Sequence, residues 1–293
     1  MPTTVVSWNI AKRHEPWRQL VGMGADVALL QEAGRPPPDV TDRIEMGPWE
    51  HWDSHYWNSR WYEGRWENLF DRWPMIVKLS DRVDVEWFKQ VSPIGLSADD
   101  EFPVSGIGTV AAARVLPRDT PPFIVVSMHA RWIRPHPSTK SKWRVGYADG
   151  SAHRIISDLS AFIGDVDPST HRILAAGDLN TIYGVKDDVQ DWTTARDDGI
   201  WHRMSGLGLE YLGPEHPNGR QAHPTPDFMK DDTANVVTYY TLRNSPATAD
   251  RQLDYVFASR GFHESLDVRA LNGIEEWGAS DHCRVLIEVG KKC

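Results

Sequence analysis

The chain has 293 residues, of which 40% are hydrophobic and 25% are charged, as in ordinary globular domains. This length suits one large two-sheet domain or two small domains. The formal net charge is −9, which argues against sequence-blind coating of nucleic acid, because that mode of binding needs a broad basic face. A polyanionic substrate held by a metal ion and a local basic patch is still compatible with this charge balance.

The cysteine content and the hydrophobic pattern bear on the cell compartment. Two cysteines, Cys283 and Cys293, are too few for a disulfide framework. The first residues lead directly into an expected strand, without the charged segment and long apolar stretch of a signal peptide. No apolar run reaches the length of a membrane span. We therefore expect a cytoplasmic protein with no membrane span, in which Cys283 is a buried thiol.

The first half of the chain is expected to be mainly β-structure. A strand, a helix and a strand are expected over residues 4–8, 16–23 and 27–31, which is a βαβ-like opening. An irregular segment, residues 34–73, follows and contains three consecutive prolines near its start. Four further strand-like stretches are 75–79, 83–88, 108–116 and 122–128.

The second half alternates between helices and strands. A helix is expected over 152–163, with Ser151 as its N-cap, because its apolar residues have helical spacing. A strand over 172–177 comes next. Residues 182–250 form a mixed region, with a helix near 194–206 and a loop rich in Pro, Asp and Thr from 213 to 235. The closing strands are expected at 252–258, 266–270 and 283–289.

Five short polar motifs lie at or beside the ends of expected strands. They are Ser7-Trp8-Asn9, Leu30-Gln31-Glu32, Gly177-Asp178-Leu179-Asn180-Thr181, Gln252-Leu253-Asp254-Tyr255 and Ser280-Asp281-His282. Any one of them alone is explained by an Asp or Asn that caps a turn. Together, at the ends of buried strands, they indicate a site built on a rigid scaffold. Carboxylates and carboxamides are the oxygen ligands that Mg²⁺ and Mn²⁺ prefer, and His beside Asp suits acid–base chemistry.

In this order the five motifs resemble those of the endonuclease/exonuclease/phosphatase superfamily, which has the DNase I-like fold. The motifs run from Asn9 to His282 and so cover nearly the whole chain. The resemblance implies an α/β protein, a four-layer α/β/β/α sandwich with a metal site at one edge of two packed sheets. Because motifs from both ends of the chain must meet, we expect residues 1–293 to form a single domain, with insertions near 34–73 and 182–250.

The resemblance also implies a role for each polar residue. Asp178 orients or deprotonates the attacking water, and Asn180 donates a hydrogen bond to the phosphate. The two are two residues apart, so in an extended segment their side chains leave the same face. Glu32 is the expected direct metal ligand. Asn9 would help to hold the metal or its water, unless it only forms a turn, and Asp281 would complete the metal environment.

Histidines are expected to face the phosphate. A protonated His282 would stabilise negative charge on the non-bridging oxygens. Asp254 would orient it and keep it cationic, because a neighbouring carboxylate raises the pKa of a histidine; otherwise Asp254 caps a turn. His129 follows strand 122–128, where relatives similar to nuclease I and sphingomyelinase carry a phosphate-contacting His. The abasic-site endonuclease branch has a Tyr-containing pattern there, from which this chain departs.

Two segments bear on the substrate. Residues 130–148 contain five basic residues and two tryptophans but no acidic residue, which suits a phosphate-rich or base-bearing substrate as well as a solvated surface loop. The expected substrate contacts there are Arg131, Lys140, Lys142 and Arg144. Residues 49–73 hold six of the 14 tryptophans; packing as a satellite core is favoured over stacking on bases.

The sequence therefore predicts a hydrolase that depends on Mg²⁺ or Mn²⁺ and cleaves a phosphodiester by in-line attack of an activated water. The expected partner is a phosphate-ester substrate, with nucleic acid among the candidates, and no protein partner is evident. One alternative is a phosphomonoesterase that acts on a small phosphorylated molecule, such as an inositol phosphate or a nucleotide. Another is a catalytically inactive module that binds a partner through its Trp-rich surface.

Overall fold

The structure is a computed structural model, which describes residues 2–48, 74–95, 98–105, 108–131, 148–164, 167, 170–186 and 192–290. The Trp-rich segment 49–73 lies outside the described residues, as do Lys140, Lys142 and Arg144. Among the described helices, none is both long and apolar enough to cross a bilayer.

Two sheets form the centre of the molecule. The first has five strands in the order β12-β13-β1-β2-β3, and β1 runs parallel to β2 and antiparallel to β13. Its strands are β1 (Thr3–Asn9), β2 (Val27–Gln31), β3 (Met75–Lys78), β12 (Leu266–Leu271) and β13 (Arg284–Val289). The second has six strands in the order β10-β11-β9-β8-β7-β4. They are β4 (Val83–Trp87), β7 (Val110–Pro117), β8 (Phe123–His129), β9 (Ile173–Asp178), β10 (Leu209–Gly213) and β11 (Asp254–Ser259).

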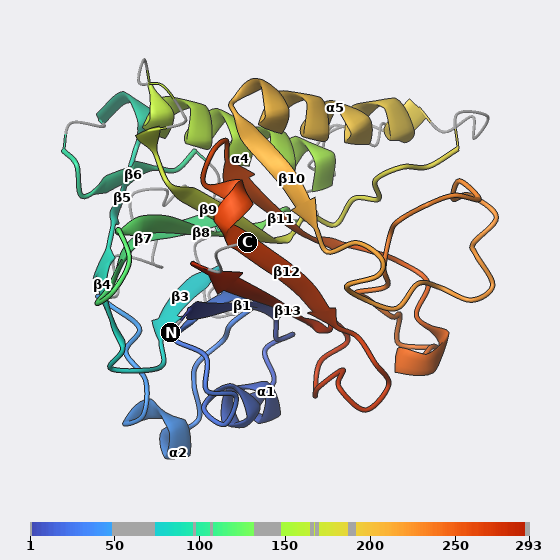
Figure 1. Cartoon of the computed structure of the whole chain (residues 1–293), viewed down its shortest axis with the longest axis horizontal. Helices are drawn as coiled ribbons and strands as arrows, with labels where there is room; N and C mark the ends of the chain where they lie inside the picture. The colour runs from blue at the N-terminus through green and yellow to red at the C-terminus, as the bar shows by residue number, and fades with distance from the viewer. Residues whose placement is uncertain are drawn as a thin grey trace, which may run out of the picture.

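Helices cover the outer face of each sheet (Figure 1). At the bottom of the view, α1 (His14–Leu20) and α2 (Pro38–Thr41) lie on the first sheet; at the top, α4 (Ala148–Ile163) and α5 (Trp192–Gly206) lie on the second. A parallel pair, β5 (Lys89–Val91) and β6 (Glu101–Pro103), flanks α4. Short 3-10 helices occupy Pro93–Gly95, Pro246–Thr248 and His263–Ser265.

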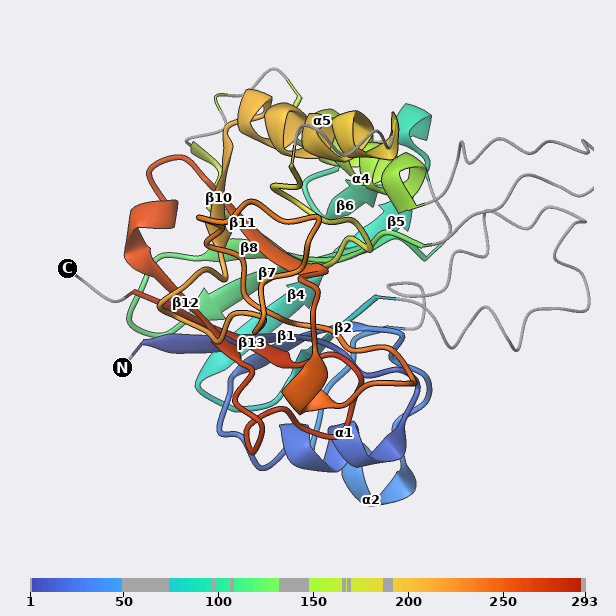
Figure 2. The same cartoon turned by 90° about the vertical axis from the view of Figure 1, so that its right-hand side faces the viewer.

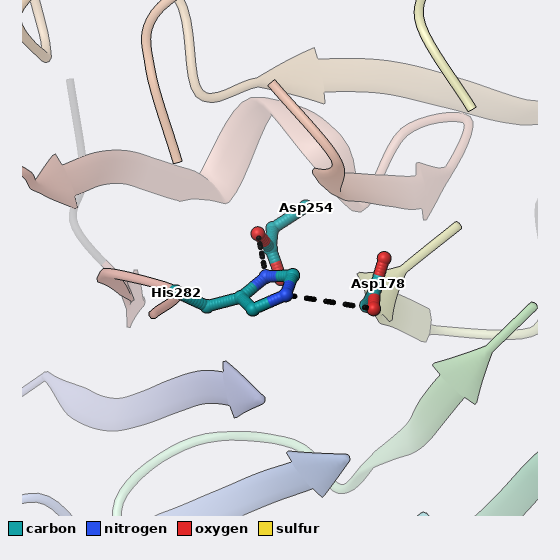
Figure 3. Close-up of side chains that lie close together, drawn as sticks. All are labelled: Asp178, Asp254 and His282. Atoms are coloured by element: carbon teal, nitrogen blue, oxygen red, sulfur yellow. Dashed lines mark hydrogen bonds and ion pairs between the residues drawn. The ribbon is translucent and has the colours of Figure 1, made fainter. Parts of the chain in front are cut away.

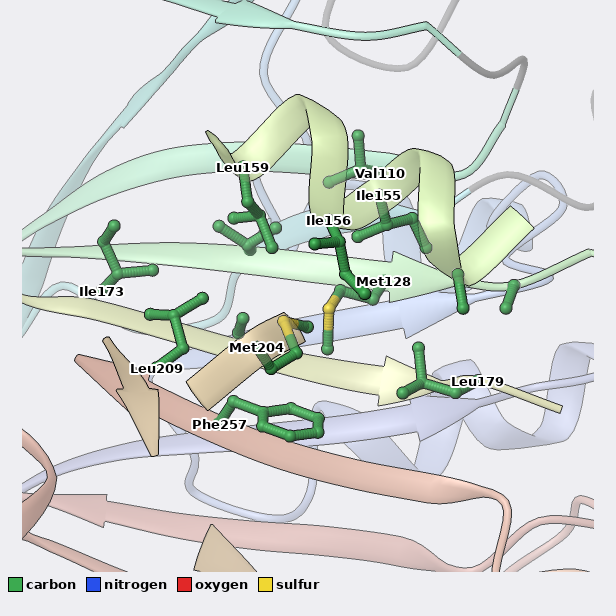
Figure 4. Packing of buried hydrophobic residues seen from close by; sticks show 14 of the residues in the cluster. Val110, Met128, Ile155, Ile156, Leu159, Ile173, Leu179, Met204, Leu209 and Phe257 are labelled. Carbon is green, nitrogen blue, oxygen red and sulfur yellow. The ribbon is translucent and has the colours of Figure 1, made fainter. Parts of the chain in front are cut away.

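The alternation of side chains along each strand explains the layers. In β1, Val5 packs between the two sheets, whereas Val6 and Trp8 pack against α1, because successive residues of a strand point to opposite faces. On the far side, Ile155, Ile156 and Leu159 of α4 pack on the outer face of the second sheet (Figure 4). The predicted four-layer α/β/β/α sandwich is confirmed.

Several elements differ from the sequence-based expectation. Ser151 is not an N-cap: it lies inside α4, and its hydroxyl donates a hydrogen bond to the carbonyl oxygen of Arg131 at 2.8 Å. The helix begins at Ala148, which is buried in the same core cluster as Ile155 and Leu159. Strands β5, β6 and β10 were not expected; the first two have three residues each, too few to show an alternating pattern.

Candidate active site

The sheet topology brings the five polar motifs to one edge of the sandwich. Parallel strands β1 and β2 end there together, with Asn9 opposite Gln31. Parallel strands β8 and β9 end there with His129 opposite Asp178. The antiparallel strand β11 begins at the same place, with Asp254 paired to Asp178. Residues that are up to 274 positions apart in the chain thereby come into contact.

Asp178 is the centre of this cluster and is 1% exposed. Its Oδ2 atom accepts hydrogen bonds from the side-chain amides of Asn9 at 3.0 Å and Asn180 at 2.8 Å. Its Oδ1 atom accepts the backbone N–H of Asn180 at 2.8 Å. The segment is not extended as expected, because Asn180 has φ +49°, a left-handed conformation that Asn tolerates. This turn is what lets Asn180 reach back to the carboxylate.

His282 lies between two carboxylates (Figure 3). Its Nδ1 atom is 2.8 Å from Asp254 Oδ2, and its Nε2 atom is 3.9 Å from Asp178 Oδ2. All three side chains are buried. The hydroxyl of Thr238 accepts the backbone N–H of Asp254 at 3.1 Å, and the ring of Tyr239 lies 4.8 Å from the imidazole. The expected pairing of Asp254 with His282 is therefore present.

The charges of this trio set its protonation. Burial raises the pKa of Asp178 to about 7, with a further rise from Asp254 and opposition from His282. Burial alone would lower the pKa of His282, but the charges of Asp254 and Asp178 and the hydrogen bond to Asp254 outweigh it and raise that pKa to about 10. His282 is therefore an imidazolium at neutral pH, as its expected role requires.

The raised pKa of His282 predicts a pH-dependent stability. Its folded pKa of about 10 lies above the ordinary 6.5, so its contribution is complete below pH 6.5 and is lost as the pH rises toward 10. Urea unfolding of the metal-free protein should show a loss on the order of a few kcal/mol over this window. The His282→Gln variant should lose less. Equal losses in the two proteins would contradict the assignment.

Glu32, His129 and Asp281 complete the edge. Glu32 follows β2 with φ +46°, and its Oε1 atom lies 3.8 Å from His129 Nε2. His129 Nε2 lies 3.9 Å from Asp178 Oδ2. The hydroxyl of Ser280 contacts Asp281 Oδ1 at 3.2 Å and donates to the carbonyl oxygen of Asn9 at 2.7 Å. Arg131 is half-buried just beyond β8.

The donor chemistry of this edge fits a hard divalent cation. Asp178, Asp254 and His282 lie close together, but His282 is bonded to Asp254 and protonated, so this trio is not the cation's donor set. Among the described atoms, Asp254 Oδ1 is buried without a hydrogen-bond partner. Both oxygens of Asp178 already accept hydrogen bonds, whereas the side chain of Glu32 is 28% exposed. Carboxylate oxygens of this kind suit Mg²⁺ or Mn²⁺ better than zinc.

Sequence reasoning missed two neighbours of this cluster. Thr238 and Tyr239 lie in the region between β10 and β11, where no periodic pattern marks them. Both residues matter through contacts with Asp254 and His282, which are distant in sequence. The sequence offered only the short polar and aromatic run Thr-Tyr-Tyr as a hint of a site there. The aromatic ring of Tyr239 closes one side of the imidazole.

No protein-family model and no curated protein matches the chain. Solved structures do match it in fold. The catalytic domain of Xenopus laevis APE2 aligns with a TM-score of 0.60 at 16% identity, covering 99% of this chain and 94% of that chain. An AP endonuclease from Archaeoglobus fulgidus gives 0.57 at 15%, covering 99% and 100%. A 3'-5' exonuclease from Neisseria meningitidis gives 0.53 at 16%, also covering 99% and 100%.

These likenesses extend over essentially the whole chain, although the identities are too low to carry an activity from one protein to another. At the end of β8 this chain has His129, whose Nε2 atom lies near both Glu32 and Asp178. The predicted resemblance is confirmed at the level of the fold: the chain has the DNase I-like fold.

Proposed function

We propose that this protein is a phosphodiester hydrolase of nuclease-like specificity that depends on a divalent metal. The observation that carries the proposal is the buried His282, bonded to Asp254 at 2.8 Å and directed at Asp178 from 3.9 Å. A cationic imidazole can bind an anionic substrate, and a nearby carboxylate that accepts a proton can activate water. The fold shared with an AP endonuclease and a 3'-5' exonuclease supports it.

Each residue has a task that follows from its contacts. Asp178 accepts the proton of the attacking water, and its pKa of about 7 suits a base at neutral pH. Asn9 and Asn180 hold its carboxylate in one orientation through their amides. His282 places positive charge where the phosphate oxygens gain negative charge, and Asp254 keeps the imidazole protonated and oriented. His129 places a second imidazole nitrogen, Nε2, at 3.9 Å from Asp178 Oδ2.

A divalent cation, Mg²⁺ or Mn²⁺, would be held by Glu32 with Asp281 and Asn9 nearby, and would neutralise charge on the phosphate. Chelator should abolish hydrolysis of bis-(p-nitrophenyl) phosphate, and added Mg²⁺ or Mn²⁺ should restore it. Glu32→Gln should raise the metal concentration needed for half-maximal activity at least about tenfold, with an unchanged circular dichroism spectrum. Glu288→Gln, a change at a half-buried position of β13, is the matched control. Full activity of metal-free protein would refute this assignment.

A phosphomonoesterase is the second candidate, because a 3' phosphatase from Neisseria has a similar fold. The same residues could act on a terminal phosphate. A metal-supplemented screen of plasmid DNA, single-stranded DNA, RNA, bis-(p-nitrophenyl) phosphate and inositol phosphates separates the two candidates.

We also propose that Arg131, Lys140, Lys142 and Arg144 contact the substrate. An inactive binding module is disfavoured because every expected polar position is occupied.

A further inference from the structure

A pocket of about 350 Å³, measured with its open mouth, lies beside the candidate active site. Its apolar lining includes Ile182, Met229 and Val237, and its polar lining includes Gln221, Asn235 and Arg251. Most of these residues belong to the long connection between β10 and β11, which extends to the right in Figure 1 and faces the viewer in Figure 2. None of the roles assigned above uses this pocket.

The pocket shares its supporting segments with the catalytic cluster. Ile182 comes two residues after Asn180, and Arg251 three residues before Asp254. Val237 precedes Thr238, whose hydroxyl accepts the backbone N–H of Asp254. A molecule in the pocket and a phosphate at Asp178 and His282 would therefore be held by the same three stretches of chain.

The walls of the pocket are already fixed to each other. Met229 forms a β-bridge with Val185, and the backbone N–H of Lys186 donates to the carbonyl oxygen of Phe228 at 3.0 Å. The side-chain amide of Asn235 donates to the carbonyl oxygen of Tyr183 at 2.7 Å. A pocket that exists before its ligand arrives loses little conformational entropy on binding.

The lining matches a flat heterocycle that has both donors and acceptors. Methionine and valine side chains can cover the faces of a ring. Gln221 and Asn235 each donate N–H to a backbone carbonyl, which leaves the amide oxygens as acceptors for exocyclic amines. Arg251 and Asp250 also belong to the lining and form an ion pair with each other, with Nε 3.5 Å from Oδ1.

We propose that this pocket binds one unpaired nucleobase, in a nucleotide or at the end of a single strand, whose phosphate lies at Asp178 and His282. This inference rests on the proposed function. The lining offers donors and acceptors for the edge of one base, and the net charge of −9 disfavours a long polyanion. Burying a base edge on matched donors and acceptors is how proteins hold unstacked nucleotides.

Inhibition of the unmodified protein tests the pocket first. Nucleoside 5'- and 3'-monophosphates should inhibit hydrolysis of bis-(p-nitrophenyl) phosphate, and the better series should have Ki values at least tenfold below that of ribose 5-phosphate, which carries the phosphate without a base. Equal Ki values for both would overturn the pocket assignment and leave the proposed function intact. If the protein hydrolyses no ester with any divalent metal, the proposed function fails, and calorimetric titration with the same compounds decides the pocket alone.

A filled pocket gives the second test. Ala222 lines the pocket and is half-buried, whereas Ala234 lies on the same connection, is exposed and is not part of the lining. Ala222→Trp should weaken nucleoside monophosphate binding at least tenfold relative to ribose 5-phosphate. Ala234→Trp should bind both as the unmodified protein does. If Ala222→Trp leaves the ratio of the two affinities unchanged, the base does not enter this pocket.

Discussion

Replacement of Asp178 by Asn is expected to lower kcat by at least about a hundredfold, because the change removes the base but keeps the shape. The amide cannot take a proton from water, and its NH₂ group would oppose the donors of Asn9 and Asn180. His282→Ala should cause a loss of similar size, because the cation that stabilises the phosphate charge is removed. Steady-state kinetics with bis-(p-nitrophenyl) phosphate at saturating metal measure both.

A double-mutant cycle separates the contributions of Asp254 and His282. Their atoms are 2.8 Å apart, and Asp254 makes its contact with the imidazole through Oδ2. If Asp254 acts only through His282, the variant with both residues changed to Ala should be little slower than the slower single variant. Fully additive losses would show that Asp254 acts on the substrate by another route. Circular dichroism of each variant confirms that the fold is retained.

Gly177→Ala is expected to lower the free energy of unfolding by at least about 3 kcal/mol, one of the largest effects of any single substitution. A Cβ atom at this position would lie 1.9 Å from the carbonyl oxygen of Met128, and the residue has φ +154°. The clash is with the backbone of the neighbouring strand, so no side-chain rotation relieves it. Urea denaturation of purified protein measures the loss.

Gly150→Ala provides the matched control for that measurement. Gly150 lies in α4, where an added Cβ meets nothing within 4 Å, so alanine should be neutral or stabilise the helix by about 0.5–1 kcal/mol. A Gly177→Ala protein as stable as the parent would mean that β8 and β9 do not approach as closely as described.

The sequence predicted the parts of the fold that depend on local pattern. Strand β2 was predicted at its observed bounds, because the apolar run Val-Ala-Leu-Leu is followed by the polar pair Gln31-Glu32. The motifs at strand ends predicted one shared site, since both parallel strand pairs must end at the same edge. Ser151 was misassigned because a serine before an apolar run is typical of an N-cap. Its hydroxyl instead donates a hydrogen bond to the carbonyl oxygen of Arg131.

Other features depend on contacts between distant residues and could not be read from the chain. The left-handed backbone at Asn180 follows from its two bonds to Asp178. The need for glycine at position 177 follows from the carbonyl oxygen of Met128 on the adjacent strand. The pocket beside the site forms where residues 221–237 meet residues 182 and 250–252, and none of these segments has a pattern that predicts the meeting.

The strand order of the first sheet determines when that sheet can be completed during synthesis. Strand β13 comes last of the five strands along the chain, yet it lies between β12 and β1, and the carbonyl oxygen of His282 accepts the indole N–H of Trp8. A chain emerging from the ribosome therefore cannot complete its first sheet until β13 has left the exit tunnel. Until then His282, which precedes β13, cannot take its place beside Asp178 and Asp254.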